Sequence, residues 1–145
     1  MGVNTTRGTS AASEAWALMF ELMHHSKQRF MAIASEFDLS PPQVMALRQL
    51  DPDETKPMSE LALALRCDNS NVTGIVDRLE DRGLVERRPG ERDRRVKMLT
   101  ITERGAQIRD ALGARLSEPP EPLASLPPDD QVALRDIMRR ALERA

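Results

Sequence analysis

The chain has 145 residues, a formal net charge of -2, 40% hydrophobic and 30% charged residues, which is the balance of one ordinary globular domain. No apolar run approaches the roughly 20 residues of a membrane-spanning helix, and the amino-terminal MGVNTTRGTS lacks the apolar centre of a secretory signal. A single cysteine excludes an internal disulfide, and two histidines leave little material for a metal site. We therefore expect a cytoplasmic protein that works without a membrane, a metal or a cofactor.

The first predicted element is a long amphipathic helix over residues 13–37. Trp16, Met23, Phe30 and Phe37 recur every seven positions, which is typical of a helix that packs along one seam. The seam predicts either a contact between two copies of the chain or a part of the core.

A second helix is predicted from Pro41 to about Leu50. Ser40 supplies the N-cap, Pro41 suits the first helical position, and Gln43 completes a capping box. The following residues 51–57, DPDETKP, read as a polar loop bounded by proline.

Two further helices are predicted over residues 59–65 and 68–82, with a turn of about three residues between them. Asp68 is placed to cap the second of these helices, and Gly83 is placed to end it. Two helices joined by so short a turn indicate a helix-turn-helix unit.

The next stretch, VERRPGERDRRVKMLTIT, predicts a β-hairpin with the Pro89-Gly90 turn in its tip region. Between Arg82 and Lys97 there are seven basic and three acidic residues, although acidic residues outnumber basic ones in the whole chain. The basic charge is therefore concentrated in the hairpin, where it counts for more than the net charge of the chain.

The carboxy-terminal part predicts a helix that Thr102 and Glu103 open, a stiff proline-rich elbow over residues 119–128, and a last helix over residues 129–144. The predicted fold is mainly α with a small β-hairpin wing. It is a winged helix-turn-helix lobe over residues 39–101, with helices from both ends of the chain beside it.

At this point the sequence resembles the MarR family of bacterial transcriptional regulators, through SELALAL, NSNVTGIVDRLEDRGLVERR and DRRVKMLTITERG. The most specific stretch is Asp93-Arg94-Arg95, then a short strand, then Ile101-Thr102-Glu103 and Gly105. It is similar to the family's wing signature Asp-x-Arg, strand, Leu-Thr-x-x-Gly, with isoleucine in place of leucine.

The resemblance covers nearly the whole chain and implies one MarR-like domain over residues 1–145. It also implies a homodimer, in which residues 10–38 and 102–145 are the dimerisation helices, the helix over 68–82 enters the major groove, and the wing contacts the backbone or minor groove.

With the apolar stripe of the helix over 68–82 turned inward, a polar face remains for double-stranded DNA. Its predicted contacts are Ser70, Asn71, Thr73, Gly74 and Arg78. Asp77 lies on the same face and repels phosphate unless it is paired. In the wing, Arg95 is expected to enter the minor groove, with Asp93 pairing its guanidinium. The phosphate contacts expected from the hairpin are Arg87, Arg88, Arg92 and Arg94.

These features predict a transcriptional regulator, of the repressor type, that binds a pseudo-palindromic operator as a homodimer. The alternative is a winged helix used for contact with another protein, without specific DNA binding, because the rest of the chain is acidic and few side chains suit base reading. An enzyme is not expected, since the sequence offers no glycine-rich phosphate loop, no credible triad and no closed metal site.

The resemblance further implies a small lipophilic or anionic effector that binds between the dimerisation helices and the DNA-binding lobe. The candidate residues on the first helix are Trp16, Met19, Phe20, Met23, His24 and Phe30. The same residues suit a dimer seam or a core, and both interpretations stay open. The neighbouring His24 and His25 point about 100° apart on a helix and cannot share a metal ion.

Cys67 stands at the apolar position before the helix over 68–82. We expect a buried, inert thiol there. The alternative is a thiol whose oxidation disturbs the start of the helix and releases DNA.

Overall fold

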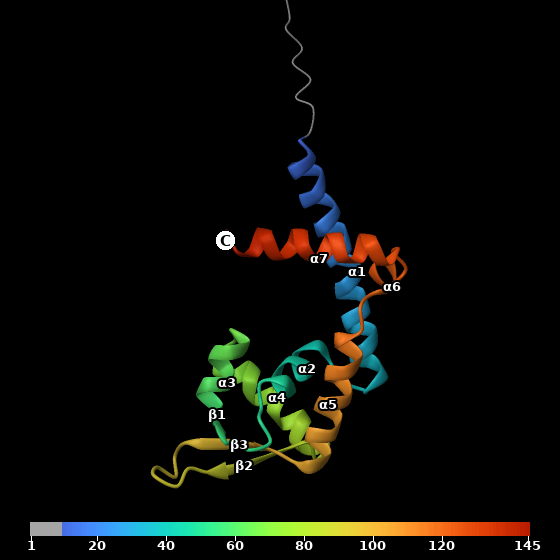
Figure 1. Cartoon of the computed structure of the whole chain (residues 1–145). Coiled ribbons are helices and arrows are strands. Elements are labelled where there is room, and N and C mark those ends of the chain that lie inside the picture. Colours follow the sequence, from blue (N-terminus) through green and yellow to red (C-terminus); the bar gives the residue numbers. More distant parts are fainter. Residues whose placement is uncertain (1–9) are drawn as a thin grey trace, which may run out of the picture.

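The computed structural model describes residues 10–145 (Figure 1). The expected lack of a secretory signal concerns residues 1–9, which lie outside the described residues. Within residues 10–145, no helix combines the length and the apolar composition that crossing a membrane requires.

Helix α1, Ala11–Glu36, confirms the long first helix of the prediction. The Ser10 hydroxyl accepts a hydrogen bond from the backbone N–H of Ser13 at 3.2 Å, which caps the helix. Beyond the end of the helix, Asp38 adopts a left-handed backbone with φ of 54° and turns the chain back toward α2.

Helix α2, Pro41–Arg48, begins with the predicted capping box. The Gln43 backbone N–H donates to the Ser40 hydroxyl at 3.4 Å, and the Ser40 backbone N–H donates to Gln43 Oε1 at 2.8 Å. These two local bonds fix where the helix begins.

The helix-turn-helix unit consists of α3, Met58–Leu65, and α4, Asn69–Asp81. The turn between them is formed by residues 66–68, as predicted. The Asp68 carboxylate accepts from the backbone N–H of Asn71 at 3.0 Å and caps α4. At the other end, Gly83 adopts a φ of 68° and terminates α4, which is the conformation that favours glycine.

The sheet has three antiparallel strands in the order β1-β3-β2, where β1 is Lys56–Pro57, β2 is Val85–Pro89 and β3 is Lys97–Ile101. Strands β2 and β3 confirm the predicted hairpin. Strand β1 corrects the prediction of a loop over residues 51–57. It escapes sequence reasoning because two residues show no alternation, and one of them is a proline at the edge of a sheet.

Helix α5, Glu103–Ser117, and helix α7, Pro128–Leu142, confirm the two predicted carboxy-terminal helices. Between them, the chain turns in the predicted elbow over residues 119–128, which also contains a short helix, α6, Glu121–Ala124, that the sequence did not predict. Pro122 is tolerated there because a proline in the first turn removes no hydrogen bond from the helix.

The core lies in the lobe built from α2 to β3 and against α5, with fully buried side chains such as Leu47, Leu61, Leu99 and Leu112. The buried residues of α1 are Ile33 and Ala34, near its carboxy-terminal end. The rest of α1 extends away from the lobe, and α7 crosses it in the view of Figure 1.

Candidate nucleic-acid interface

Helix α4 divides into a buried apolar stripe and an exposed polar face. The stripe contains Val72, Val76 and Leu79. The exposed side carries every residue of α4 that the sequence predicts to contact DNA: Ser70, Asn71, Thr73, Gly74 and Arg78. The structure therefore brings these five residues together on one surface of the lobe.

The short polar side chains at the start of α4 are ordered by bonds within the chain. The Ser70 hydroxyl donates to Asp68 Oδ1 at 3.0 Å, and the Thr73 hydroxyl donates to the Asn69 carbonyl at 2.8 Å. The pKa of the Asp68 carboxyl lies below its usual range, because the Asn71 N–H and then the Ser70 hydroxyl donate to the charged form. Each hydroxyl keeps lone pairs that can accept a bond from a base.

Gly74 lies in the middle of this face and leaves it flat. A side chain at this position would meet no atom within 4 Å among residues 10–145. The fold itself does not require glycine here, and its absence of a side chain permits close approach of another molecule to the helix backbone.

The wing is the β2–β3 hairpin with the loop between Pro89 and Lys97. The Gly90 N–H donates to the Val96 carbonyl at 2.8 Å, so Gly90 forms the neck of the loop and not its tip. This corrects the predicted place of the Pro-Gly turn. A Cβ atom on Gly90 would lie 2.6 Å from the Asp93 carbonyl oxygen, so the neck closes only around glycine.

Asp93 acts differently from the prediction. Its carboxylate accepts a hydrogen bond from the backbone N–H of Arg95 at 2.9 Å, and the ion pair expected with the Arg95 guanidinium is not among the ion pairs of residues 10–145. Asp93 therefore closes a turn in the loop, as aspartate side chains commonly do. The guanidinium of Arg95 is left to other partners.

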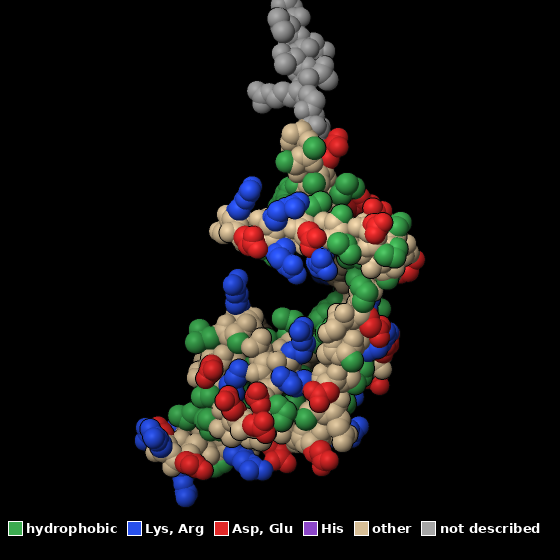
Figure 2. Space-filling view, viewed as in Figure 1, with side chains coloured by type: hydrophobic (Ala, Val, Ile, Leu, Met, Phe, Trp, Pro, Cys, Tyr) green, Lys and Arg blue, Asp and Glu red, His purple; other side chains and the backbone are tan. Residues whose placement is uncertain are grey.

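The arginines of the hairpin fall into two groups. Arg92, Arg94 and Arg95 are exposed and form no ion pair within the described part of the chain. Figure 2 shows basic side chains at the free end of the wing. Arg88 pairs with Glu86 at 2.8 Å, and Arg87 pairs with Asp77 and lies against α4.

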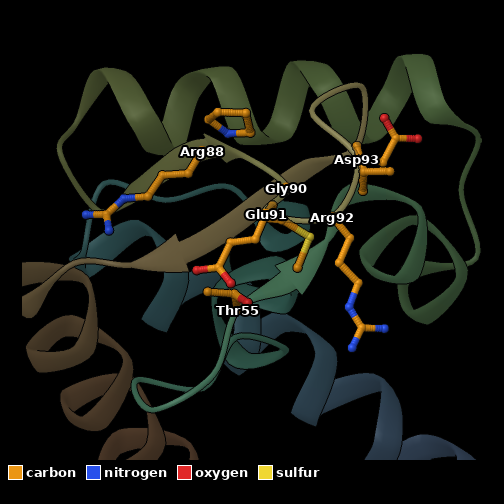
Figure 3. A pocket seen from close by; sticks show the side chains of 9 residues that line it. Thr55, Arg88, Gly90, Glu91, Arg92 and Asp93 are labelled. Atoms are coloured by element: carbon orange, nitrogen blue, oxygen red, sulfur yellow. The ribbon is translucent and has the colours of Figure 1, made fainter.

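A hollow of about 460 Å³ lies under the wing loop (Figure 3) and is lined in part by Thr55, Arg88, Glu91 and Arg92. Thr55 belongs to the loop before β1, a segment in which sequence reasoning expected no part of the site. In Figure 3 Arg88 extends to the left and Arg92 extends downward, so the two guanidinium groups do not converge on one ligand.

The stretch Ile101-Thr102-Glu103 to Gly105 joins the wing to helix α5. The Thr102 hydroxyl donates to the Gly83 carbonyl at 2.7 Å and accepts from the Gly105 N–H at 3.0 Å, while the Thr102 N–H donates to the Leu84 carbonyl at 3.0 Å. A Cβ atom on Gly105 would collide with the Leu84 carbonyl and lie 2.8 Å from Ile101 Cγ1. This signature therefore holds the end of α4, the start of β2 and the start of α5 together.

The candidate effector residues lie along α1. Trp16, Phe20, Met23 and His24 are exposed, and the rings of Trp16 and Phe20 meet edge to face at 4.8 Å. Met19 is half-buried and Phe30 packs against the core. The single chain does not enclose these six residues, and their assignment to an effector stays a prediction.

Cys67 is half-buried, which corrects the expectation of a buried thiol. It lines an open hollow of about 690 Å³ together with residues such as Pro42, Met45 and Ile75. The turn that carries Cys67 leaves one side of its side chain uncovered.

The fold and this surface define a winged helix-turn-helix protein with an exposed recognition helix, α4, and a basic wing, a class that binds double-stranded DNA. Residues 39–97 match the MarR family. The chain is 30% identical to an uncharacterized HTH-type transcriptional regulator, YfiV, of Bacillus subtilis, over 94% of this chain and 88% of the relative. It is also 30% identical to the HTH-type transcriptional repressor NicR of Pseudomonas putida, over 84% of this chain and 80% of NicR.

Among solved structures, a variant of Staphylococcus aureus MepR bound to an oligodeoxyribonucleotide superimposes with a TM-score of 0.71 over 89% of this chain and 96% of MepR. Its sequence identity of 20% supports the fold alone. The relatives and the family match together place the chain in a group of transcriptional regulators. The chain belongs to the MarR family.

Proposed function

We propose that the chain is a repressor that binds a pseudo-palindromic operator in double-stranded DNA as a homodimer. The observation that carries the proposal is the pairing of a polar, uncovered face on α4 with three exposed wing arginines free of acidic partners among residues 10–145: Arg92, Arg94 and Arg95. A helix in the major groove with a basic wing on the flanking backbone uses both features.

The homodimer is supported by the apolar side chains that α1 and α7 leave uncovered. Trp16 is 58% exposed, Leu18 65% and Leu142 72%. Large apolar side chains gathered in this number mark a surface that another molecule covers. A second copy of the chain satisfies this need and supplies the second recognition helix of a symmetric operator.

The relatives support the direction of regulation. NicR of Pseudomonas putida is named a transcriptional repressor, and so is MprA of Escherichia coli, which is 35% identical over 69% of this chain. The chain is therefore proposed to repress. A lipophilic or anionic effector that prefers a dimer with wrongly spaced α4 helices would lower the affinity for the operator.

DNA binding is tested by selecting an operator from random or genomic fragments and measuring its dissociation constant at several salt concentrations. Each phosphate contact of a basic side chain steepens the plot of log affinity against log salt by about 0.9. Arg95→Ala should weaken binding to the operator and flatten this slope, whereas Arg135→Ala, a charge removal on the distant α7, should leave both unchanged. Absence of DNA binding by the native chain at low salt would contradict the proposal and favour a winged helix used for protein contact.

The effector is tested by screening small molecules for release of the selected operator. His24→Gln combined with His25→Gln should weaken the response to an acidic effector, because a protonated histidine favours an anion. An unchanged response would remove the histidines from the proposed site.

A further inference from the structure

Arg87 is held against helix α4 and does not extend toward solvent. Its Nη2 atom pairs with Asp77 Oδ1, and its Nε atom lies 3.8 Å from Glu80 Oε2. Its backbone N–H donates to the same Glu80 oxygen at 3.1 Å. The side chain is 20% exposed, compared with 66% for the neighbouring Arg88.

This contact joins the two parts of the interface that must fit DNA together. Asp77 and Glu80 lie one turn apart on α4, whereas Arg87 lies in β2, paired with Leu99 of β3 in the middle of the hairpin. The other polar links between α4 and the wing are at its root, where the Leu84 N–H donates to Leu79 and Thr102 binds the Gly83 carbonyl. Arg87 adds a link further along the strand, where it limits rotation of the wing about that root.

The same contact changes the charge that DNA meets. Asp77 lies on the exposed face of α4 beside Thr73 and Gly74, and its side chain is 53% exposed. Without Arg87, the carboxylates of Asp77 and Glu80 would stand unpaired within the described lobe and repel phosphate. With Arg87 in place, one positive charge offsets one of these two negative charges and so reduces the repulsion.

We propose that Arg87 is a positioning residue, which sets the angle between the recognition helix α4 and the wing by binding Asp77 and Glu80. It is not the phosphate contact that the sequence predicts. This inference rests on the proposed DNA binding, because the angle matters only for a molecule that touches α4 and the wing at once.

A double-mutant cycle on operator affinity tests the inference, with Arg87→Ala, Asp77→Ala and the double variant. If Arg87 acts through Asp77, each single variant loses roughly tenfold in operator affinity and the double variant loses little more than either one, since the two side chains form one unit. If Arg87 instead contacts phosphate, the losses multiply or Asp77→Ala binds more tightly, because a repelling charge has gone. Either of these outcomes overturns the proposal.

The salt dependence of DNA affinity provides a second test, and a loss of protein stability would not produce the same result. Although Arg87→Ala also exposes two carboxylates to any DNA, it should change the salt slope by less than the loss of a phosphate contact does. It should also lose more affinity for the operator than for unrelated DNA, because positioning serves the specific complex. A slope reduced by about 0.9 per subunit would identify a phosphate contact and contradict positioning. Arg88→Ala is the matched control, since it removes the same charge from the same strand without touching α4.

Two further measurements keep the result interpretable. Arg87→Lys should restore part of the affinity, since lysine reaches one carboxylate but lacks the planar fork that can approach two. Thermal denaturation of each variant identifies loss of folding, and the cycle is measured well below the lowest melting temperature. If the native protein binds the operator, Arg95→Ala weakens that binding and the cycle is additive, only the positioning role of Arg87 fails. If the native protein binds no DNA, the proposed function fails.

Discussion

At the scale of single residues, the polar side chains of the lobe act largely through backbone groups. Asp68 and Asp93 accept backbone N–H groups, and the Thr102 hydroxyl donates to a carbonyl. The guanidinium of Arg82 donates to the carbonyls of Phe37 and Asp38, at 3.0 and 2.6 Å. The basic segment between Arg82 and Lys97 thus includes an arginine that binds the backbone carbonyls just beyond the end of α1. Charge alone does not distinguish it from the arginines of the wing.

The cap of α4 makes a testable contribution to stability and to its pH dependence. Asp68→Ala should lower the urea midpoint of unfolding at neutral pH, because the start of α4 loses its acceptor, and Asp68→Asn should preserve most of it. The Asn71 N–H and the Ser70 hydroxyl lower the pKa of Asp68 in the folded state. A carboxyl whose pKa is lowered in the folded state stabilises the protein at pH values above its pKa in the unfolded state. This stabilisation is lost as the pH falls through the pKa of the folded state. Urea midpoints between about pH 6 and pH 2 should therefore fall less steeply for Asp68→Asn than for the native chain. Equal slopes would show that the cap does not titrate in this range.

At the scale of elements, what the sequence predicts is what local chemistry determines. The capping box of Ser40 and Gln43 and the cap of Asp68 involve groups within three residues of one another, so a short stretch of sequence contains both partners. Strand β1 exists only because Lys56 and Pro57 lie beside Leu99 and Met98, which are distant in the chain. The partners of Arg87 are hidden for the same reason, since they depend on how β2 packs on α4. Sequence reasoning therefore places the recognition surface but not the contacts that orient it.

Replacement by alanine should change the free energy of unfolding in opposite directions at Gly105, where the wing joins α5, and at Gly74 on α4. Gly105→Ala should destabilise the fold by about 3 kcal/mol, because its Cβ would collide with the Leu84 carbonyl at a junction of backbone hydrogen bonds that cannot easily shift. Gly74→Ala should keep stability or raise it by up to about 1 kcal/mol, because alanine favours the helix and finds open space. Chemical denaturation measures both changes. Operator binding by Gly74→Ala should weaken, and unchanged affinity would show that DNA does not approach α4 closely at this residue.

At the scale of the whole molecule, helix α1 is tied to α5 and to the lobe by charged side chains. Arg115 of α5 pairs with Glu36 of α1 at 2.9 Å and with Glu118 at 2.6 Å, and Arg29 of α1 donates to the Arg115 carbonyl at 2.9 Å. Arg82 links the carboxy-terminal end of α4 to the end of α1. A rotation of α1 within the proposed dimer would therefore move the contacts that its carboxy-terminal end makes with α4 and α5, which would give the proposed effector a mechanical route to α4.

Two matched substitutions test whether the exposed apolar side chains of α1 and α7 form a dimer interface or are only part of a generally apolar surface. Leu142 on α7 is 72% exposed, and Leu63 on α3 is 79% exposed. If α1 and α7 form the interface, Leu142→Asp places a charge in an apolar contact and should shift the mass measured by light scattering from dimer toward monomer. Leu63→Asp should leave the dimer intact, although it changes a more exposed leucine in the same way.

Because a symmetric operator engages two recognition helices at once, the monomeric variant should lose at least about a hundredfold in operator affinity. Its affinity for an isolated half-site should stay near that of the native subunit. A native chain that is monomeric in solution, or a Leu142→Asp variant that remains a dimer, would place the interface elsewhere.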